Sequence, residues 1–150
     1  MGAVEAAAPF VTDAGLLAAQ VQFASPVNYK YAEGRSQAQT TQQNQMFQMR
    51  VPAADLAAAF ACMEGRLGEQ PGYAVKVIRT FRPEPDVCTC RWEVTFKRKP
   101  YTVVVDGSSK YRFREGKVTG IEETWETRKE GAKNKSQVST CGRAGREAAG

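Results

Sequence analysis

The amino-acid sequence predicts an α+β domain in which helices precede a sheet of four long antiparallel strands and a short one. Two patterns carry this prediction. Apolar residues recur at helical spacing between residues 52 and 67, and from residue 73 onward apolar and polar residues alternate. Size agrees with it, because 150 residues of which 42% are hydrophobic are enough for one domain with its own core.

The first fifty residues contain the weaker signals. Residues 4–19 are rich in alanine and predict a short helix that breaks at Pro9. The run "VQF" at 21–23 predicts a short strand, which Pro26 limits. Residues 35–50 are rich in glutamine and in helix formers. Two interpretations of them stay open: a disordered low-complexity segment, or a segment whose apolar end packs on the domain.

The segment 52–67 predicts one amphipathic helix. Pro52 opens it, since proline is tolerated at the first helical position. Gly68 lies just past its end, and the pair Pro71-Gly72 prevents it from continuing. One face of this helix is apolar and consists of Leu56, Phe60, Met63 and Leu67.

The β-patterned runs follow the helix at residues 73–81, 87–97, 101–113 and 118–126. In the first run one face is expected to hold Tyr73, Val75, Val77 and Phe81. The second run alternates most cleanly, with one face made of Cys88, Cys90, Trp92, Val94 and Phe96. Such one-sided strands are typical of an antiparallel sheet with one covered face. Gly107 predicts a bulge or a kink in the third run, and Gly116 predicts a positive φ in the turn "REGK".

The net charge of +5 does not describe a basic groove. Residues 129–150 carry five Lys or Arg residues against two Glu residues, which is +3, so the body of the chain carries only +2. A nucleic-acid-binding protein would cluster its cations on a folded face. Nucleic acid is therefore not expected as a partner.

The chain has four cysteines and no histidine. Without histidine, Cys/His zinc sites and Ser-His-Asp triads are excluded. Only Cys88 and Cys90 are close in sequence, and they sit inside a strand pattern, which favours packed, reduced thiols. We expect no metal site and no cofactor.

Nothing in the sequence predicts a membrane span or a targeting segment. No run of about 18 apolar residues occurs. The N-terminus contains Glu5 and Asp13 and lacks a basic region, unlike a secretory signal. Position 6 is Ala6, so the myristoylation pattern after Gly2 is incomplete. These features predict a soluble intracellular protein.

Two motifs connect the chain to a known superfamily. The first is close to F-x-D-P-x-N-x-F-x-G: Phe23, Pro26, Asn28 and Gly34 match it, and Tyr29 or Tyr31 stands for the second aromatic residue. Ser25 replaces its acidic residue, and two extra residues precede the glycine. The second is close to G-K-I followed by H-x-D-x-W-D: it is matched by Gly116, Lys117, Val118 and Trp125, with Glu123 and Glu126 for the acids and Ile121 for the histidine. Trp92 and the segment 100–108 also agree.

Over residues 20–127 the chain thus resembles the SnoaL-like, nuclear-transport-factor-2-like superfamily, in particular an uncharacterised branch from plants, algae and cyanobacteria. The resemblance implies a cone-shaped fold in which a curved antiparallel sheet wraps around N-terminal helices and leaves a pocket at its open end. It divides the chain into a short N-terminal helix or truncated start at 1–19, the SnoaL-like domain at 20–128, and a basic tail at 129–150 that is expected to be disordered. A missing first helix would leave part of the concave face of the sheet open, so a homodimer or a protein partner is expected. The expected location is the cytoplasm or, as the branch implies, a chloroplast or other plastid.

Members of the superfamily include isomerases, epoxide hydrolases and cyclases as well as non-catalytic binding domains, so fold alone does not decide function. The last strand would cross the pocket, and period-two spacing places Ile121, Glu123 and Trp125 on one face. A carboxylate partly buried beside an indole has a raised pKa and can act as a general acid or base.

Glu123 is accordingly the candidate catalytic residue, with Tyr111 and Arg91 as candidate oxyanion donors. The predicted ligand pocket consists of Trp92, Phe96, Arg91, Tyr111, Ile121 and Trp125. Acidic residues on a final strand are often only solvated or paired across strands, and no histidine is present to share the proton chemistry. We therefore favour a non-catalytic pocket for a small apolar ligand, a protein-interaction module, or both, with a small isomerase- or hydrolase-type enzyme as the alternative.

Overall fold

The computed structural model of the chain describes residues 2–26 and 46–131. They form the helices α1 (Ala3–Ala7) and α3 (Ala53–Gly68), the short 3-10 turn η1 (Ala14–Leu16), and six strands. The strands are β1 (Leu17–Ser25), β2 (Phe47–Pro52), β3 (Ala74–Glu84), β4 (Val87–Arg98), β5 (Tyr101–Arg114) and β6 (Lys117–Gly131). The motif residues Asn28, Tyr29, Tyr31 and Gly34, most of the glutamine-rich segment, and Cys141 lie outside the described residues.

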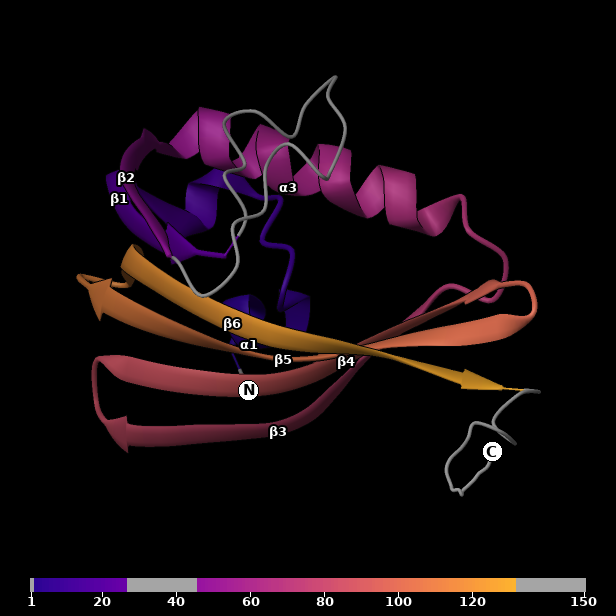
Figure 1. The fold of residues 1–150 in the computed structure, drawn as a ribbon. Coiled ribbons are helices and arrows are strands. Elements are labelled where there is room, and N and C mark those ends of the chain that lie inside the picture. The colour runs from indigo at the N-terminus through magenta and orange to yellow at the C-terminus, as the bar shows by residue number, and fades with distance from the viewer. Residues whose placement is uncertain (1, 27–45, 132–150) are drawn as a thin grey trace.

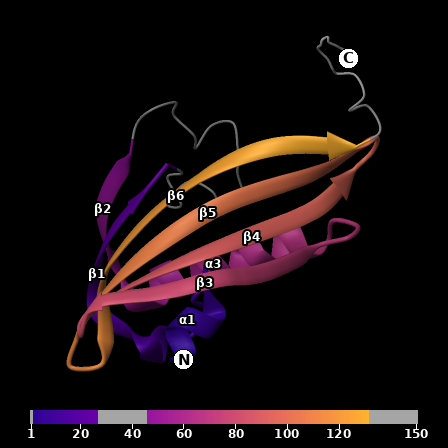
Figure 2. The ribbon, with the colours of Figure 1, turned by 90° about the horizontal axis from the view of Figure 1, so that it is seen from below.

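All six strands belong to one curved sheet with the order β2-β1-β6-β5-β4-β3 (Figure 1). Neighbours pair antiparallel except β1 and β6, which are parallel. The helix α3 runs along the concave side of the sheet, and Figure 2 shows α1 on the same side. This is the α+β cone that the sequence predicts, with the helix at 53–68 and the four long strands close to their expected bounds.

The core lies beneath the first half of α3. Phe60 of α3 makes edge-on contacts with the rings of Phe10 and Phe23, at centroid distances of 6.5 and 5.6 Å. Leu56 and Phe60 are fully buried, whereas Met63 and Leu67 on the same helical face are only partly buried. The helix therefore packs tightly through its first half and less tightly through its second.

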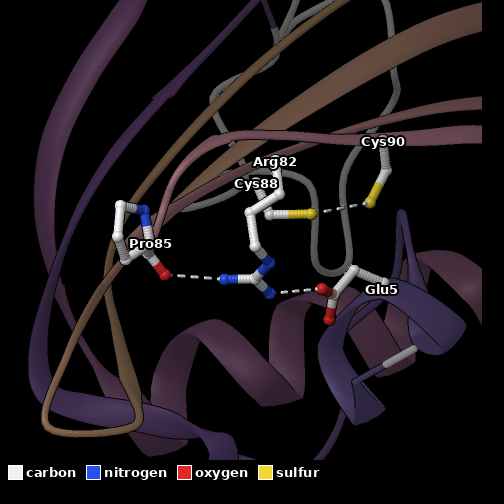
Figure 3. Close-up of polar contacts among 5 residues, drawn as sticks. All are labelled: Glu5, Arg82, Pro85, Cys88 and Cys90. Carbon is white, nitrogen blue, oxygen red and sulfur yellow. Dashed lines mark hydrogen bonds and ion pairs between the residues drawn. The ribbon is translucent and has the colours of Figure 1, made fainter.

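The short helix α1 is held to the sheet by one partly buried ion pair, shown in Figure 3. Arg82 of β3 donates a hydrogen bond to the Glu5 carboxylate at 2.5 Å and a second one to the Pro85 carbonyl oxygen at 2.9 Å. Burial acts to raise the pKa of Glu5. The hydrogen bonds from its own backbone and from Arg82, together with the Arg82 charge, outweigh burial and lower that pKa.

The apolar end of the glutamine-rich segment packs on the domain, which was one of its two interpretations. Phe47, Met49 and Val51 alternate in β2, which pairs with β1, and Met49 and Val51 pack against the core. Two other sequence predictions about local structure are wrong. Gly107 is not a bulge, since the register of β5 runs through it without a shift. The register of β3 shifts instead between Val77 and Arg79.

The shift in β3 moves Phe81 to the other face of the strand from the one shared by Val75 and Val77, because Phe81 then pairs with Thr89. As a result, Ile78 and Phe81 are 51% and 56% exposed. The predicted positive φ of Gly116 is confirmed at 81°.

The ends of the described segments also differ in detail from the predicted ones. The strand β1 begins at Leu17, so it is longer than the run at 21–23. The strand β6 continues to Gly131, so residues 129–131, which the sequence analysis placed in the tail, belong to the sheet. Within the described residues, neither helix has the length and hydrophobicity that a membrane crossing requires.

Candidate functional site

The register of the sheet brings polar side chains together on its concave face. Ser109 of β5 pairs with Cys90 of β4 on one side and with Glu123 of β6 on the other. From the next strand, the Ser25 hydroxyl donates a hydrogen bond of 3.0 Å to Oε1 of Glu123. All four residues are buried, and Glu123 is only 1% exposed. A row of polar groups therefore crosses the sheet beneath the helix layer.

The next row toward the open end consists of Trp92, Gly107 and Trp125, which are register partners across three strands. The indole of Trp92 lies on Gly107, so closely that a Cβ atom there would come within 2.2 Å of the ring. Its Nε1 donates a hydrogen bond of 2.9 Å to the Ser109 hydroxyl. The rings of Trp92 and Trp125 are 6.3 Å apart and tilted by 53°. Gly107 is thus required for close approach, and the hydrogen bond fixes the indole orientation.

Tyr111 lies one row deeper than Glu123 and is completely buried. Among the described residues, no group forms a hydrogen bond of normal geometry with its hydroxyl. Burial raises the pKa of this hydroxyl strongly and the charge of Glu123 raises it further, while the nearby Ser109 hydroxyl acts in the opposite direction. Tyr111 therefore stays protonated at neutral pH and is a potential hydrogen-bond donor.

A cavity of about 560 Å³ opens between the second half of α3 and the sheet. Its apolar wall comes mainly from Met63, Leu67, Trp92, Val94, Phe96, Val103, Val105 and Trp125, together with Pro9 and Phe10. Its polar lining consists of Glu123, Thr127, Gln70, Arg66, Arg98 and Lys129. The volume and the mainly apolar wall are those of a site for a small molecule.

The structure divides the predicted site residues into three groups. Trp92, Phe96, Trp125 and the candidate catalytic residue Glu123 line the cavity together. Tyr111 and Ile121 are on the same face but lie in the core next to Phe23, below the cavity floor. Arg91 does not line the cavity: it is exposed on the convex face, because β4 pairs with β5 without a shift and side chains alternate.

Three basic lining residues were not among the predicted site residues: Arg66, Arg98 and Lys129. A signal for two of them is present in the sequence. The alternation that selects Trp92 and Phe96 continues to Arg98, and the one that selects Glu123 and Trp125 continues to Lys129.

The two strand cysteines form a separate, buried pair. The sulfur atoms of Cys88 and Cys90 are 3.9 Å apart. Burial, followed by the neighbouring Cys88, raises the pKa of Cys90 to about 12, and burial likewise raises the pKa of Cys88. Both are therefore packed thiols of low reactivity, as predicted. Within residues 2–26 and 46–131, no three side chains with suitable ligand atoms come together as a metal site.

The fold is nuclear-transport-factor-2-like. A protein of unknown function with this fold from Cytophaga hutchinsonii superposes with a TM-score of 0.52 at 10% identity, over 75% of this chain and 81% of that one. IdmH, a proposed polyketide cyclase from Streptomyces antibioticus, gives 0.51 at 9% identity, over 75% and 76%. A protein with a ketosteroid-isomerase-like fold from Catenulispora acidiphila, solved with trimethylamine, gives 0.46 at 14% identity, over 74% and 70%.

No family model matches the chain, and no curated protein is similar to it in sequence. The similarity to solved structures therefore shows the fold alone.

Proposed function

We propose that this protein binds a small, mainly apolar molecule in the cavity between α3 and the sheet. The observation that carries the proposal is the composition of the wall: two tryptophans, two phenylalanines and three valines surround a space of about 560 Å³ that also reaches one buried carboxylate. Apolar and aromatic walls with a few placed polar groups are typical of ligand sites. Glu123, oriented by Ser25, would be the polar anchor at the inner end.

A direct test uses the neutral fluorescent probe phenylnaphthylamine, which brightens in apolar surroundings. We expect saturable binding to the wild type and a rise in melting temperature, since a ligand present at 100 times its Kd stabilises the native state by about 2.7 kcal/mol.

Two matched variants locate the probe. Thr127 lines the cavity, whereas Thr124 lies on the convex face of the same strand. Thr127→Trp should fill part of the cavity and weaken binding by about tenfold, which corresponds to about 1.4 kcal/mol. Thr124→Trp should leave binding unchanged. Equal binding by both variants would place the probe elsewhere and contradict the proposal.

A second candidate function is catalysis with Glu123 as general acid or base. It is favoured by one observation: a buried carboxylate lines the cavity, one row from a protonated Tyr111 hydroxyl that has no hydrogen bond of normal geometry among the described residues. A carboxylate and a neutral donor are two parts of a proton-transfer site. If a substrate is identified, Glu123→Gln should abolish turnover while probe binding persists. Retained turnover would exclude this role.

A homodimer or a protein partner stays a prediction, and so do the plant, algal and cyanobacterial branch and a plastid location. The exposed Ile78 and Phe81 on the edge strand β3 are the apolar residues that such a contact would cover. Native mass spectrometry of gently purified protein would report the oligomeric state and any retained small molecule in one measurement.

A further inference from the structure

The charged groups of the cavity are separated by depth. Glu123 is buried at the inner end, whereas Arg98 and Lys129 are exposed. Glu123 and Lys129 are six positions apart on β6, which corresponds to roughly 20 Å along an extended strand. Exposure thus marks the mouth of the cavity, and the acid and the cations lie at opposite ends.

Three cations reach this mouth from different walls. Arg98 is the last residue of β4, and Lys129 of β6 pairs with Val103 of β5, which in turn pairs with Phe96. Arg66 comes from the last turn of α3, across the cavity. Among the cavity-lining residues there is no second acid besides Glu123.

None of the described carboxylates is paired with these cations. Within the part of the chain that the structure describes, Arg66, Arg98 and Lys129 form no ion pair. The contrast on the same strand is Arg128, which faces the convex side and is paired with both Asp106 and Glu130.

Ring faces hold two of the three cations at the rim. The Arg98 guanidinium lies 5.7 Å from the centre of the Phe96 ring, and the Lys129 ammonium lies 5.2 Å from that of Tyr101. A cation–π contact orients a cation without using its N–H donors in hydrogen bonds. The donors of Arg98 and Lys129 can therefore serve a ligand.

We infer that the ligand of this cavity is an apolar molecule with a single anionic group at one end, bound with that group at the mouth between Arg98, Lys129 and Arg66. The inference rests on the proposed function, because it names the chemical class for the same cavity. Charge also fixes the orientation. An anion placed inward would be buried beside a second acidic group, Glu123, and away from the three cations, while outward it meets these cations and forms charge-assisted hydrogen bonds.

The test compares two probes that differ mainly in charge: anilinonaphthalene sulfonate, which carries an anionic group, and the neutral phenylnaphthylamine. The test variant is the double substitution Arg98→Gln with Lys129→Gln. The control is Arg91→Gln with Lys97→Gln. It also removes two positive charges, but from β4 residues that do not line the cavity. Kd values are measured by fluorescence titration at low and high salt.

We expect the test variant to weaken the anionic probe about five- to tenfold and the neutral probe less than twofold. The control should change neither, and added salt should weaken only the anionic probe in the wild type. If both probes bind the wild type and the test variant weakens neither, or weakens both equally, the anionic-ligand inference is wrong while the proposed cavity function stands. If neither probe binds the wild type, both fail together.

Discussion

Replacing Gly107 by alanine tests the geometry on which the cavity depends. The added Cβ atom would lie 2.2 Å from the outer carbons of the Trp92 indole, far inside van der Waals contact. The indole is only 3% exposed, so it cannot move away without losing its place in the cavity wall. It would also lose its hydrogen bond to the Ser109 hydroxyl.

The magnitude follows from these contacts. Overpacking a filled site costs about 1–3 kcal/mol, and loss of one neutral hydrogen bond costs about 1 kcal/mol. Alanine recovers about 0.5–1 kcal/mol relative to glycine within a strand. We therefore expect Gly107→Ala to lower the free energy of unfolding by about 1.5–3 kcal/mol. Gly120 is the control, because a Cβ there meets its nearest neighbour at 3.6 Å, so Gly120→Ala should be neutral or slightly stabilising.

The assay is urea unfolding followed by far-ultraviolet circular dichroism, which does not depend on the tryptophan signal. A double-mutant cycle isolates the contact: in a Trp92→Phe background the three indole atoms that clash are gone, and Gly107→Ala should cost much less. If Gly107→Ala were as stable as Gly120→Ala, or equally costly in both backgrounds, the close packing of Trp92 on Gly107 would be refuted.

Two further predictions concern the turn between β5 and β6 and the ion pair of the N-terminal helix α1. Glu115 has a positive φ of 53°, so Glu115→Asn should stabilise the protein by about 0.5–1 kcal/mol in urea unfolding; Glu115→Ala is the control and should give no such gain. Glu5→Gln should lower the melting temperature at pH 7, whereas Glu84→Gln at the exposed end of β3 should not. Because the pKa of Glu5 is lowered in the folded state, its contribution is complete above its ordinary value of 4.5 and is lost as the pH falls through the folded-state pKa. The gap between wild type and Glu5→Gln should therefore close in acid; a constant gap would contradict the ion pair as its cause.

Much of the fold is predictable from local periodicity. The helix α3 and the strands β3 to β6 follow from it because each has one face that must be apolar. The alternation of Phe47, Met49 and Val51 is also a local signal for β2, although it spans only a few residues. The parallel pairing of β1 with β6 could not be predicted this way. Phe23 and Ile121 are register partners almost a hundred residues apart, and such pairing leaves no local signal. The register shift at Ile78 is equally invisible, and it reverses the predicted direction of Phe81.

The residues of the candidate site were likewise predictable only where local alternation was sufficient. Alternation places Trp92, Phe96, Glu123 and Trp125 on the concave face, and the structure brings them together. Alternation cannot say at which point along a strand the core ends and the cavity begins. Tyr111 and Ile121 satisfy the pattern equally well, yet they are covered by the core around Phe23 and Phe60. Arg98 and Lys129 are not among the predicted site residues because the predicted strands end at residues 97 and 126, and Lys129 was assigned to the tail, whereas β4 ends at Arg98 and β6 at Gly131.

The boundary between core and cavity is set by α3. Leu56 and Phe60 are buried in the core, while Met63 and Leu67, farther along the same helix, line the cavity. Glu123 lies at this boundary: it is buried against Ser25 and also lines the cavity. Among the described residues, the cavity that exposes this carboxylate to a ligand is also lined by Arg98 and Lys129 at its other end. Any specificity for charge is consequently exercised at the rim, before the apolar part of a ligand meets Trp92 and Trp125.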